Sequence, residues 1–314
     1  MVQALGAALC AGAILFFFSE TLFWGRPGRA PLAELVLSAL AYSVLAGALL
    51  AVLAGTRARS AAALVLCGAV YGWLSEGVLA GTLYQNFPVQ VSWTGLAWHD
   101  LLSVCGGLFG LGAALRHSLG RTVTVSALLG VFWGAWATTW WQPGEGAVVT
   151  PLAAFALHAA GQGALLALAY WALPGLLRGA TFTSRNGRTG LALVLLAWFG
   201  VVTVPAQLTA LLILPPLLVL TGLALRRHAR QPAAGQELLL DVLRRPIRAT
   251  RSLAVLTMPA VAAGVYGLLL LSGRSAGINV AVYWVLTPLG FAAYALSWWR
   301  VWRGAGHSRG PSAS

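Results

Sequence analysis

The sequence predicts an all-α membrane protein: a polytopic transmembrane helical bundle of about ten spans with both termini in the cytoplasm (N-in/C-in). Three observations carry this prediction. Of the 314 residues, 59% are hydrophobic and only 9% are charged, whereas soluble domains carry about 25% charged residues. Apolar runs near the roughly 20 residues that cross a bilayer recur along the chain. The mean hydropathy is +0.80, and the basic residues lie between the apolar runs.

The apolar segments, taken in order, predict the individual spans. They cover residues 2–24, 32–54, 61–84, 96–115, 122–141, 151–176, 190–205, 207–225, 252–272 and 278–300. One helix over 190–225 would be roughly 54 Å long, far beyond a hydrocarbon core of roughly 30 Å. Pro205 offers a break because proline disrupts the helix before it, so we expect two spans there. Segment 2–24 has no basic region and no small-residue cleavage site, which favours a retained span over a removed signal peptide.

The arginines fix the expected orientation. The chain has no lysine, so all 20 basic residues are arginine; 17 of them follow even-numbered spans and three follow odd-numbered ones. Basic residues concentrate on the cytoplasmic side, so we expect cytoplasmic termini in a plasma or inner membrane. Because topology explains the net charge of +13, no nucleic-acid partner is expected. The absence of lysine also excludes the Schiff-base chemistry of the usual retinal proteins.

We expect a single integral membrane domain over 1–314, with the cytoplasmic loop 226–251 and the short cytoplasmic tail 301–314 as parts of it. The segment QELLLDVLRRPIRATR within that loop has an apolar stripe and several arginines. One interpretation places it on the membrane surface, where each arginine gains about 1 kcal/mol from anionic lipids. The other interpretation is an ordinary solvated connector. The lipid bilayer is the partner expected in either case.

Known catalytic and cofactor motifs are missing from the sequence. It holds no CxxC or Cys/His cluster, no HExxH helix, no glycine-rich nucleotide loop and no GxSxG elbow. The cofactor is therefore unknown, and no metal is assigned. Carboxylate and imidazole ligands suit Zn, Mn or Fe, so the candidate ligands of a metal would be Glu76, His99 and His158.

Polar residues in the outer halves of the predicted spans are the candidate binding or proton-coupling residues: Glu76, His99, Asp100, His158, Gln162 and Glu20. A charged carboxylate inside a bilayer costs about 2.5–3.5 kcal/mol, so such residues are functional candidates by default. Glu76 precedes Tyr84 by eight residues, which places it roughly 12 Å below the outer boundary. We expect it to pair with His99 or His158, in an outward-facing pocket that all these groups approach.

Structural interpretations of the same residues stay open. Glu76 and His158 could simply form hydrogen bonds between helices, while His99 and Asp100 could mark the water interface. The charge-free loop 85–94 would be either a lid over the pocket or an inert turn. The outer tryptophans are expected to form an interfacial belt: Trp24, Trp93, Trp98, Trp140 and Trp141. A Ser-Glu pair followed by glycine occurs at residues 19–25 and again at 75–81, by duplication of a helical hairpin or by chance.

Three functions fit these patterns. The first is a transporter or a proton- or cation-coupled carrier for a small solute, favoured by the span count, the break near Pro205 and the buried Glu76. The second is a membrane-embedded enzyme for a lipid or isoprenoid substrate, with a Glu/His acid–base or metal site. The third is a scaffold or subunit without catalysis, favoured by the missing motifs. The sequence favours the carrier but leaves the choice among carrier, enzyme and scaffold open.

Overall fold

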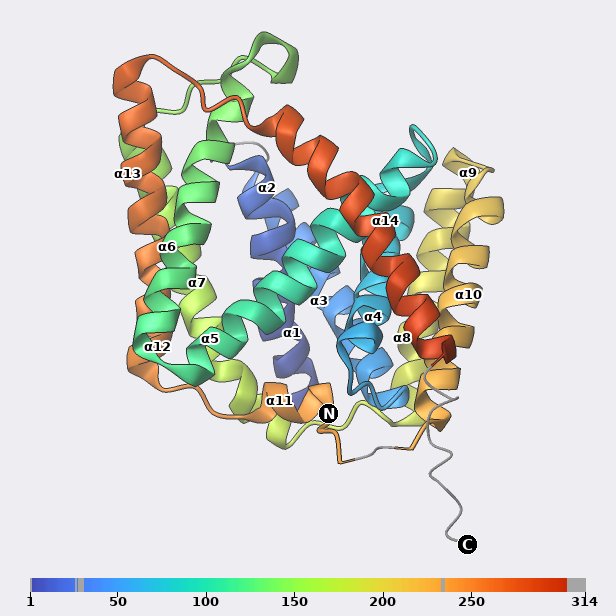
Figure 1. Cartoon of the computed structure of the whole chain (residues 1–314). Coiled ribbons are helices and arrows are strands. Elements are labelled where there is room, and N and C mark those ends of the chain that lie inside the picture. Colours follow the sequence, from blue (N-terminus) through green and yellow to red (C-terminus); the bar gives the residue numbers. More distant parts are fainter. Residues whose placement is uncertain (1, 26, 28–30, 233–234, 304–314) are drawn as a thin grey trace, which may run out of the picture. The chain divides into compact units, whose positions relative to one another are not determined.

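The computed structural model describes residues 2–25, 27, 31–232 and 235–303 (Figure 1). Within these ranges the regular elements are all helices, in agreement with the predicted all-α class. The predicted cytoplasmic tail lies outside the described residues from position 304 onward, as do residues 233 and 234 of the predicted loop 226–251.

Ten helical stretches among the described residues are long and apolar enough to cross a membrane, which confirms the predicted number. We number them spans 1 to 10. In order they are Val2–Trp24, Leu32–Gly55, Ala61–Ala80, Val91–His117, Leu119–Trp141, Leu152–Arg178, Arg185–Ala206, Ala210–Arg230, Ala249–Ser272 and Asn279–Arg303. Three short helices lie between them: η3 (Thr82–Tyr84), η6 (Pro143–Glu145) and α11 (Leu239–Arg244).

Spans 7 and 8 are separate helices, as the break near Pro205 predicts. Span 7 ends at Ala206, and Gln207 then has an extended backbone with φ of −149° and ψ of 92°. Other boundaries differ from the prediction. Span 3 ends at Ala80, four residues earlier than expected, and span 4 begins at Val91, five residues earlier. The predicted loop 85–94 is therefore shorter than its polar composition suggests, because its second half is helical.

Several spans change from α winding to the wider π winding, in which hydrogen bonds join residues five apart. The π segments are η1 (Phe17–Thr21), η2 (Ser75–Ala80), η4 (Val91–Leu111) and η7 (Phe199–Thr203). They carry four of the six predicted site residues: Glu20, Glu76, His99 and Asp100. Because π segments are rare and are often found at functional sites, their coincidence with these residues directs attention to them.

The chain forms two compact units, and each is described by itself. Unit 1 comprises Met1–Gly47, Leu102–Thr181 and Leu243–Val285; unit 2 comprises Ala48–Leu101, Phe182–Val242 and Leu286–Ser314. The single-domain expectation stays a prediction.

Unit 1 packs its helices closely through glycines. Helix α6 (Leu119–Trp136) contacts α13 (Thr257–Ser272), and a Cβ on Gly130 or Gly134 would lie 2.5 Å from a carbonyl oxygen of α13. Such small-xxx-small spacing lets two membrane helices approach backbone to backbone. Helix α7 (Leu152–Arg178) packs against both α1 (Val2–Phe16) and α13.

Unit 2 contains a buried apolar cluster around span 3. Its members come from α4 (Ala61–Leu74), η2, η3, the start of η4, η7 and α10 (Ala210–Arg230). They are Ala69, Trp73, Val78, Leu83, Tyr84, Val91, Leu96, Phe199, Ala210 and Leu214. Gly290 of α14 (Asn279–Arg303) also packs against the start of η4, where a Cβ would lie 3.1 Å from Ala97 N.

Arginine side chains donate hydrogen bonds to backbone carbonyls at helix ends in the region that the sequence assigns to the cytoplasm. In unit 2, Arg59 is 7% exposed and donates to the His228 carbonyl at 3.1 Å and to the Gln231 carbonyl. In unit 1, Arg251 donates to the Arg116 carbonyl at 2.7 Å. The last carbonyls of a helix have no partner within the helix, so these side chains satisfy groups that would otherwise need water.

Candidate functional site

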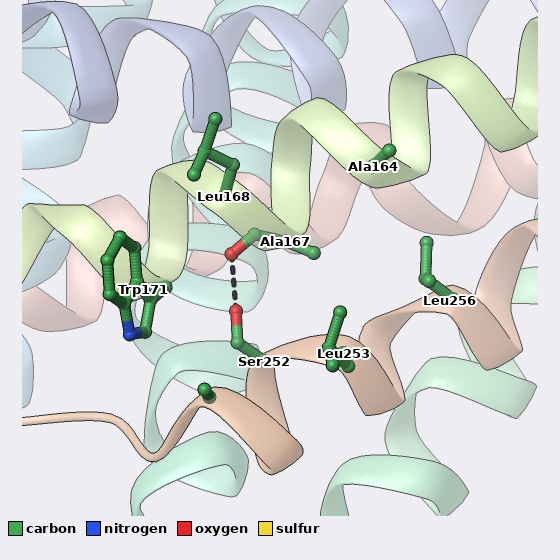
Figure 2. Close-up of a pocket in the computed structure, with 8 residues that line it drawn as sticks. Ala164, Ala167, Leu168, Trp171, Ser252, Leu253 and Leu256 are labelled. Carbon is green, nitrogen blue, oxygen red and sulfur yellow. Dashed lines mark hydrogen bonds between the residues drawn. The ribbon is translucent and has the colours of Figure 1, made fainter.

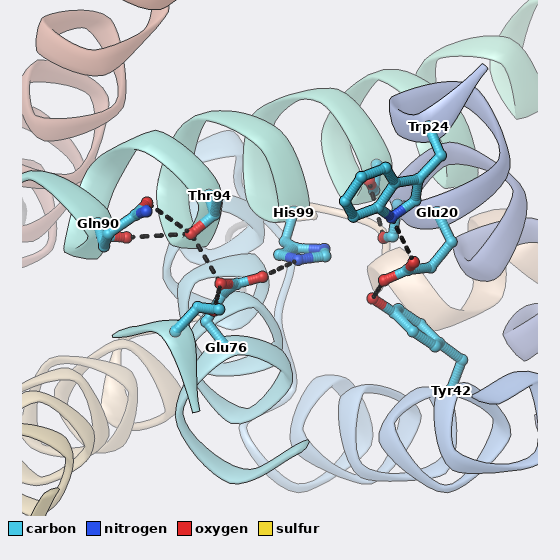
Figure 3. Close-up of polar contacts among 10 residues, drawn as sticks. Glu20, Trp24, Tyr42, Glu76, Gln90, Thr94 and His99 are labelled. Atoms are coloured by element: carbon cyan, nitrogen blue, oxygen red, sulfur yellow. Dashed lines mark hydrogen bonds and ion pairs between the residues drawn. The ribbon is translucent and has the colours of Figure 1, made fainter. Parts of the chain in front are cut away.

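Glu76 is the centre of a buried polar site in unit 2 (Figure 3). The residue is 7% exposed. Its Oε1 lies 2.7 Å from His99 Nε2, and its Oε2 accepts hydrogen bonds from Thr94 Oγ1 at 2.9 Å and from Thr82 Oγ1. Both carboxylate oxygens are thus satisfied by groups from two helical segments, η3 and η4, as a buried polar group requires.

Two glycines on α4 allow η4 to come this close. Gly68 and Gly72 are one turn apart on the same face. A Cβ on Gly72 would overlap the Gly95 carbonyl oxygen and lie 3.2 Å from the His99 Cβ. Trp73 Nε1 then donates to the Val91 carbonyl at 3.0 Å, which holds the start of η4 against α4. The backbone approach therefore depends on glycine, and it brings His99 to Glu76.

The end of span 3 is held by donors from outside the helix. Gly81 has a left-handed backbone with φ of 71°. Tyr84 Oη donates to the Gly77 carbonyl at 2.6 Å, Thr203 Oγ1 to the Val78 carbonyl at 3.0 Å, and Gln207 Nε2 to the Gly81 carbonyl at 2.9 Å. Burial raises the pKa of the Tyr84 hydroxyl, so this donor keeps its proton. The turn that carries Glu76 is consequently fixed on several sides.

Asp100 follows His99 on η4 and is fully buried. Its carboxylate packs against Gly68, where a Cβ would overlap Oδ1. The buried thiol of Cys67 is the neighbour of that glycine in the chain. Three predicted site residues of unit 2 therefore lie along one contact between span 3 and η4, with Glu76 and His99 in direct hydrogen-bond contact.

Unit 1 holds a second carboxylate with its own donors (Figure 3). Tyr42 Oη donates to Glu20 Oε1 at 2.7 Å, and Trp24 Nε1 donates to Glu20 Oε2 at 3.1 Å. The next residue, Thr21, has its Oγ1 3.4 Å from Gln162 Oε1 on α7. The structure thus connects Gln162 to the segment that carries Glu20.

His158 forms no such contact. It lies one turn before Gln162 on α7, and its Nε2 is buried with no hydrogen-bond partner among the described residues. Of the two histidines expected as partners of Glu76, only His99 therefore forms a described hydrogen bond with it. The expectation that all six groups share one pocket stays a prediction.

Among the described residues, no three His, Cys, Asp or Glu side chains lie close enough to hold a metal ion. A groove of about 240 Å³ does occur in unit 1, between α7 and the start of span 9 (Figure 2). Its lining is apolar and includes Leu168, Trp171, Leu253 and Leu256. Ser252 in the groove donates to the Ala167 carbonyl, and no predicted site residue lines it.

Sequence reasoning missed most of the hydrogen-bond partners. The sequence places Thr94 in a loop, gives no signal for Tyr42 and assigns Trp24 to an interfacial belt. Trp98, assigned to the same belt, is 1% exposed and therefore buried in the protein. One signal was available: the spacing of Gly68 and Gly72 is the small-xxx-small pattern that marks close helix contacts in membranes.

Comparisons of this chain with models of protein families, with curated proteins and with solved structures found no match.

Proposed function

We propose that this integral membrane protein is a proton-coupled carrier for a small solute, with Glu76 and His99 as its proton-binding pair. The observation that carries the proposal is the buried contact of 2.7 Å between Glu76 Oε1 and His99 Nε2. Intramembrane ionisable residues are costly, and they commonly mark ion and proton pathways.

The Glu76–His99 pair is suited to reversible proton binding. Carboxylate and imidazole share one proton, so the coupled pair is either both charged or both neutral without moving heavy atoms. In either form it avoids the cost of an isolated charge in the bilayer, about 2.5–3.5 kcal/mol. A second proton gives a neutral Glu76 beside a charged His99. This extra proton would be the transported one.

Thr94 offers a way to convert protonation into movement. Its Oγ1 lies 2.9 Å from Glu76 Oε2 and 3.3 Å from both the Gln90 carbonyl oxygen and Gln90 Oε1. A hydroxyl has only one hydrogen to donate. When Glu76 takes up a proton and becomes a poorer acceptor, the Thr94 hydrogen bond is free to pass to Gln90. Protonation would then change the hydrogen bonding at the start of span 4.

The helices around this site are interrupted. Segments η2, η4 and η7 all depart from α winding, and span 7 ends at Ala206. Span 8 contains the consecutive residues Pro215 and Pro216. Carriers build their substrate and ion sites from interrupted helices of this kind.

The test uses purified chain in proteoliposomes loaded with a pH-sensitive dye and exposed to a panel of small solutes. We expect a solute-dependent change of internal pH that Glu76→Gln abolishes and that Glu34→Gln, on an exposed residue, leaves intact. An equal proton flux in Glu76→Gln and wild type would contradict the coupling role.

A membrane-embedded enzyme for a lipid or isoprenoid is the second candidate. The observation in its favour is that Glu76 holds His99 by hydrogen bonding, which is how a carboxylate orients a histidine for acid–base catalysis. Mass spectrometry of membrane lipids incubated with the chain distinguishes the two. New products lost in His99→Gln would favour the enzyme. If the chain is a scaffold, we expect neither proton flux nor new lipid products, and the variants should only assemble more weakly.

Orientation and lipid contacts complete the proposal. The arginine distribution supports cytoplasmic termini in a plasma or inner membrane, which fusions of a compartment-sensitive reporter to each terminus would test. Loop 226–251 would contact anionic lipids through its arginines. Binding of the purified chain to vesicles of varied anionic lipid content tests that partner. If the loop is only a solvated connector, binding should not depend on the anionic lipid.

A further inference from the structure

The segment around Glu20 in unit 1 repeats the segment around Glu76 in unit 2. Each glutamate lies on a π-helix and directly follows a buried serine, Ser19 or Ser75. Five positions after each glutamate, the chain leaves the helix at a left-handed glycine, Gly25 with φ of 60° and Gly81 with φ of 71°.

The following helix supplies a hydrogen-bond partner at a matching position. Tyr42 comes 22 positions after Glu20, and His99 comes 23 positions after Glu76. Each contacts its glutamate at 2.7 Å between the side-chain atoms. The two partners therefore match in position, in target and in distance, although one is a phenol and the other an imidazole.

The close helix contacts also match. Gly12 and Gly68 both lie eight positions before their glutamate. A Cβ on Gly12 would lie 2.5 Å from the Ser43 Cα, and a Cβ on Gly68 would overlap the Asp100 carboxylate. Ser43 and Asp100 directly follow the two hydrogen-bond partners in the chain. All these pairs share an offset of 56 residues in the first helix and 57 in the second.

We infer that the described residues of 2–47 and residues 61–101 are duplicated helical hairpins and that Glu20 is a second proton-binding carboxylate. The inference rests on the proposed function of Glu76, and it raises the number of coupled carboxylates from one to two. Tyr42 and Trp24 each donate to a different oxygen of Glu20.

The groups around Glu20 determine how its protonation would change the charge of the site. Segment η1 packs against α1 and α7, contacts η4 through Ser103, and contacts α3 (Leu32–Gly55) through Tyr42. These elements carry the following titratable or charged side chains: Cys10 on α1, Glu34 and Tyr42 on α3, His99, Asp100 and Cys105 on η4, and His158, Tyr170 and Arg178 on α7. Tyr42 and Trp24, which donate to Glu20, are a phenol and an indole, and both are neutral. Proton binding to Glu20 therefore changes the charge of that site, whereas the Glu76 site can also move a proton within a pair.

The experiment is an infrared pH titration of the purified full-length chain in detergent, with glutamate labelled by ¹³C so that Asp100 does not interfere. We expect two carbonyl bands from protonated buried glutamates. Glu20→Gln should remove one and Glu76→Gln the other, while Glu34→Gln should remove neither. Tyr42→Phe should shift the Glu20 band in frequency without removing it, because it deletes a donor and keeps the acid.

The outcomes separate the inference from the proposed function. Two bands that both persist in Glu20→Gln, with one lost in Glu76→Gln, would overturn the second site and leave the Glu76 proposal standing. If Glu76→Gln removes no band, the proposed function fails by itself. Should Glu20→Gln not fold, a glutamate spectrum unchanged by Tyr42→Phe would still overturn the inference.

Discussion

Spans 3 and 7 are nearly equal in length and apolar character but opposite in environment. Over the most apolar part of each span, 67% of the residues of Ala61–Ala80 are buried, against 6% for Arg185–Ala206, although the mean hydropathies are 1.6 and 2.0. Hydropathy therefore identifies a span without saying which neighbours it has. The difference lies in small and polar residues, because span 3 places Gly68, Gly72 and Glu76 against η4.

The largest difference in stability between the two spans is expected from glycine substitutions. Gly72→Leu forces a side chain into the Gly95 carbonyl, whereas a Cβ on Gly200 in span 7 meets nothing within 4 Å, so Gly200→Leu has open space to start from. We expect Gly72→Leu to destabilise the fold by about 4 kcal/mol or more and Gly200→Leu to change it by less than about 0.5 kcal/mol. Thermal unfolding of both variants in the same detergent measures the effect. Equal losses would show that burial of span 3 is not what the glycine provides.

The next largest effect concerns the pair that span 3 buries. His99→Ala leaves Glu76 without its imidazole partner, so we expect a loss of about 3–5 kcal/mol of stability. The double variant with Glu76→Gln should recover part of that loss, because it removes the unpaired carboxylate. Chemical denaturation of the single and double variants measures the coupling, and strict additivity would refute a direct interaction.

A smaller loss is expected when one hydroxyl is removed. Thr94→Val keeps the shape of the side chain and deletes the donor to Glu76, which should cost about 1.5 kcal/mol. The matched change Gln90→Leu removes the alternative side-chain acceptor of Thr94 and should cost less. If Thr94→Val is neutral in unfolding and in proton flux, the proposed transfer from Glu76 to Gln90 fails.

The smallest effect should come from the contact that joins the two compared spans. Thr203 of span 7 is 5% exposed and donates to the Val78 carbonyl. Thr203→Val should cost about 1 kcal/mol, the usual value of one neutral hydrogen bond. Thr189→Val, on an exposed residue at the start of the same span, is the control. A loss as large as that of His99→Ala would mean that span 7 is more integral to unit 2 than its exposure indicates.

The number of spans could be predicted from sequence because apolar length and arginine position depend on the bilayer, which acts on every helix alike. The site could be predicted only in part. The sequence identifies Glu76 and His99 by residue type, but the predicted ends of spans 3 and 4 differ from those in the structure. Span 4 begins at Val91, through polar residues such as Ser92 and Thr94 that are typical of a loop. Nothing in local composition distinguishes π winding from α winding, since it depends on which outside donors satisfy the carbonyls.

The wide winding of η2 has a further consequence for how the chain tolerates changes in length. A π turn holds more residues than an α turn for a similar rise, so it stores a surplus residue within an unbroken helix. Losing one residue from Ser75–Ala80 should let that turn tighten, whereas losing one from Ala61–Leu74 rotates every later side chain by about 100°. A scan of single-residue deletions through span 3 should therefore recover more folded protein in its last third. Equal recovery along the whole span would show that the surplus is not usable.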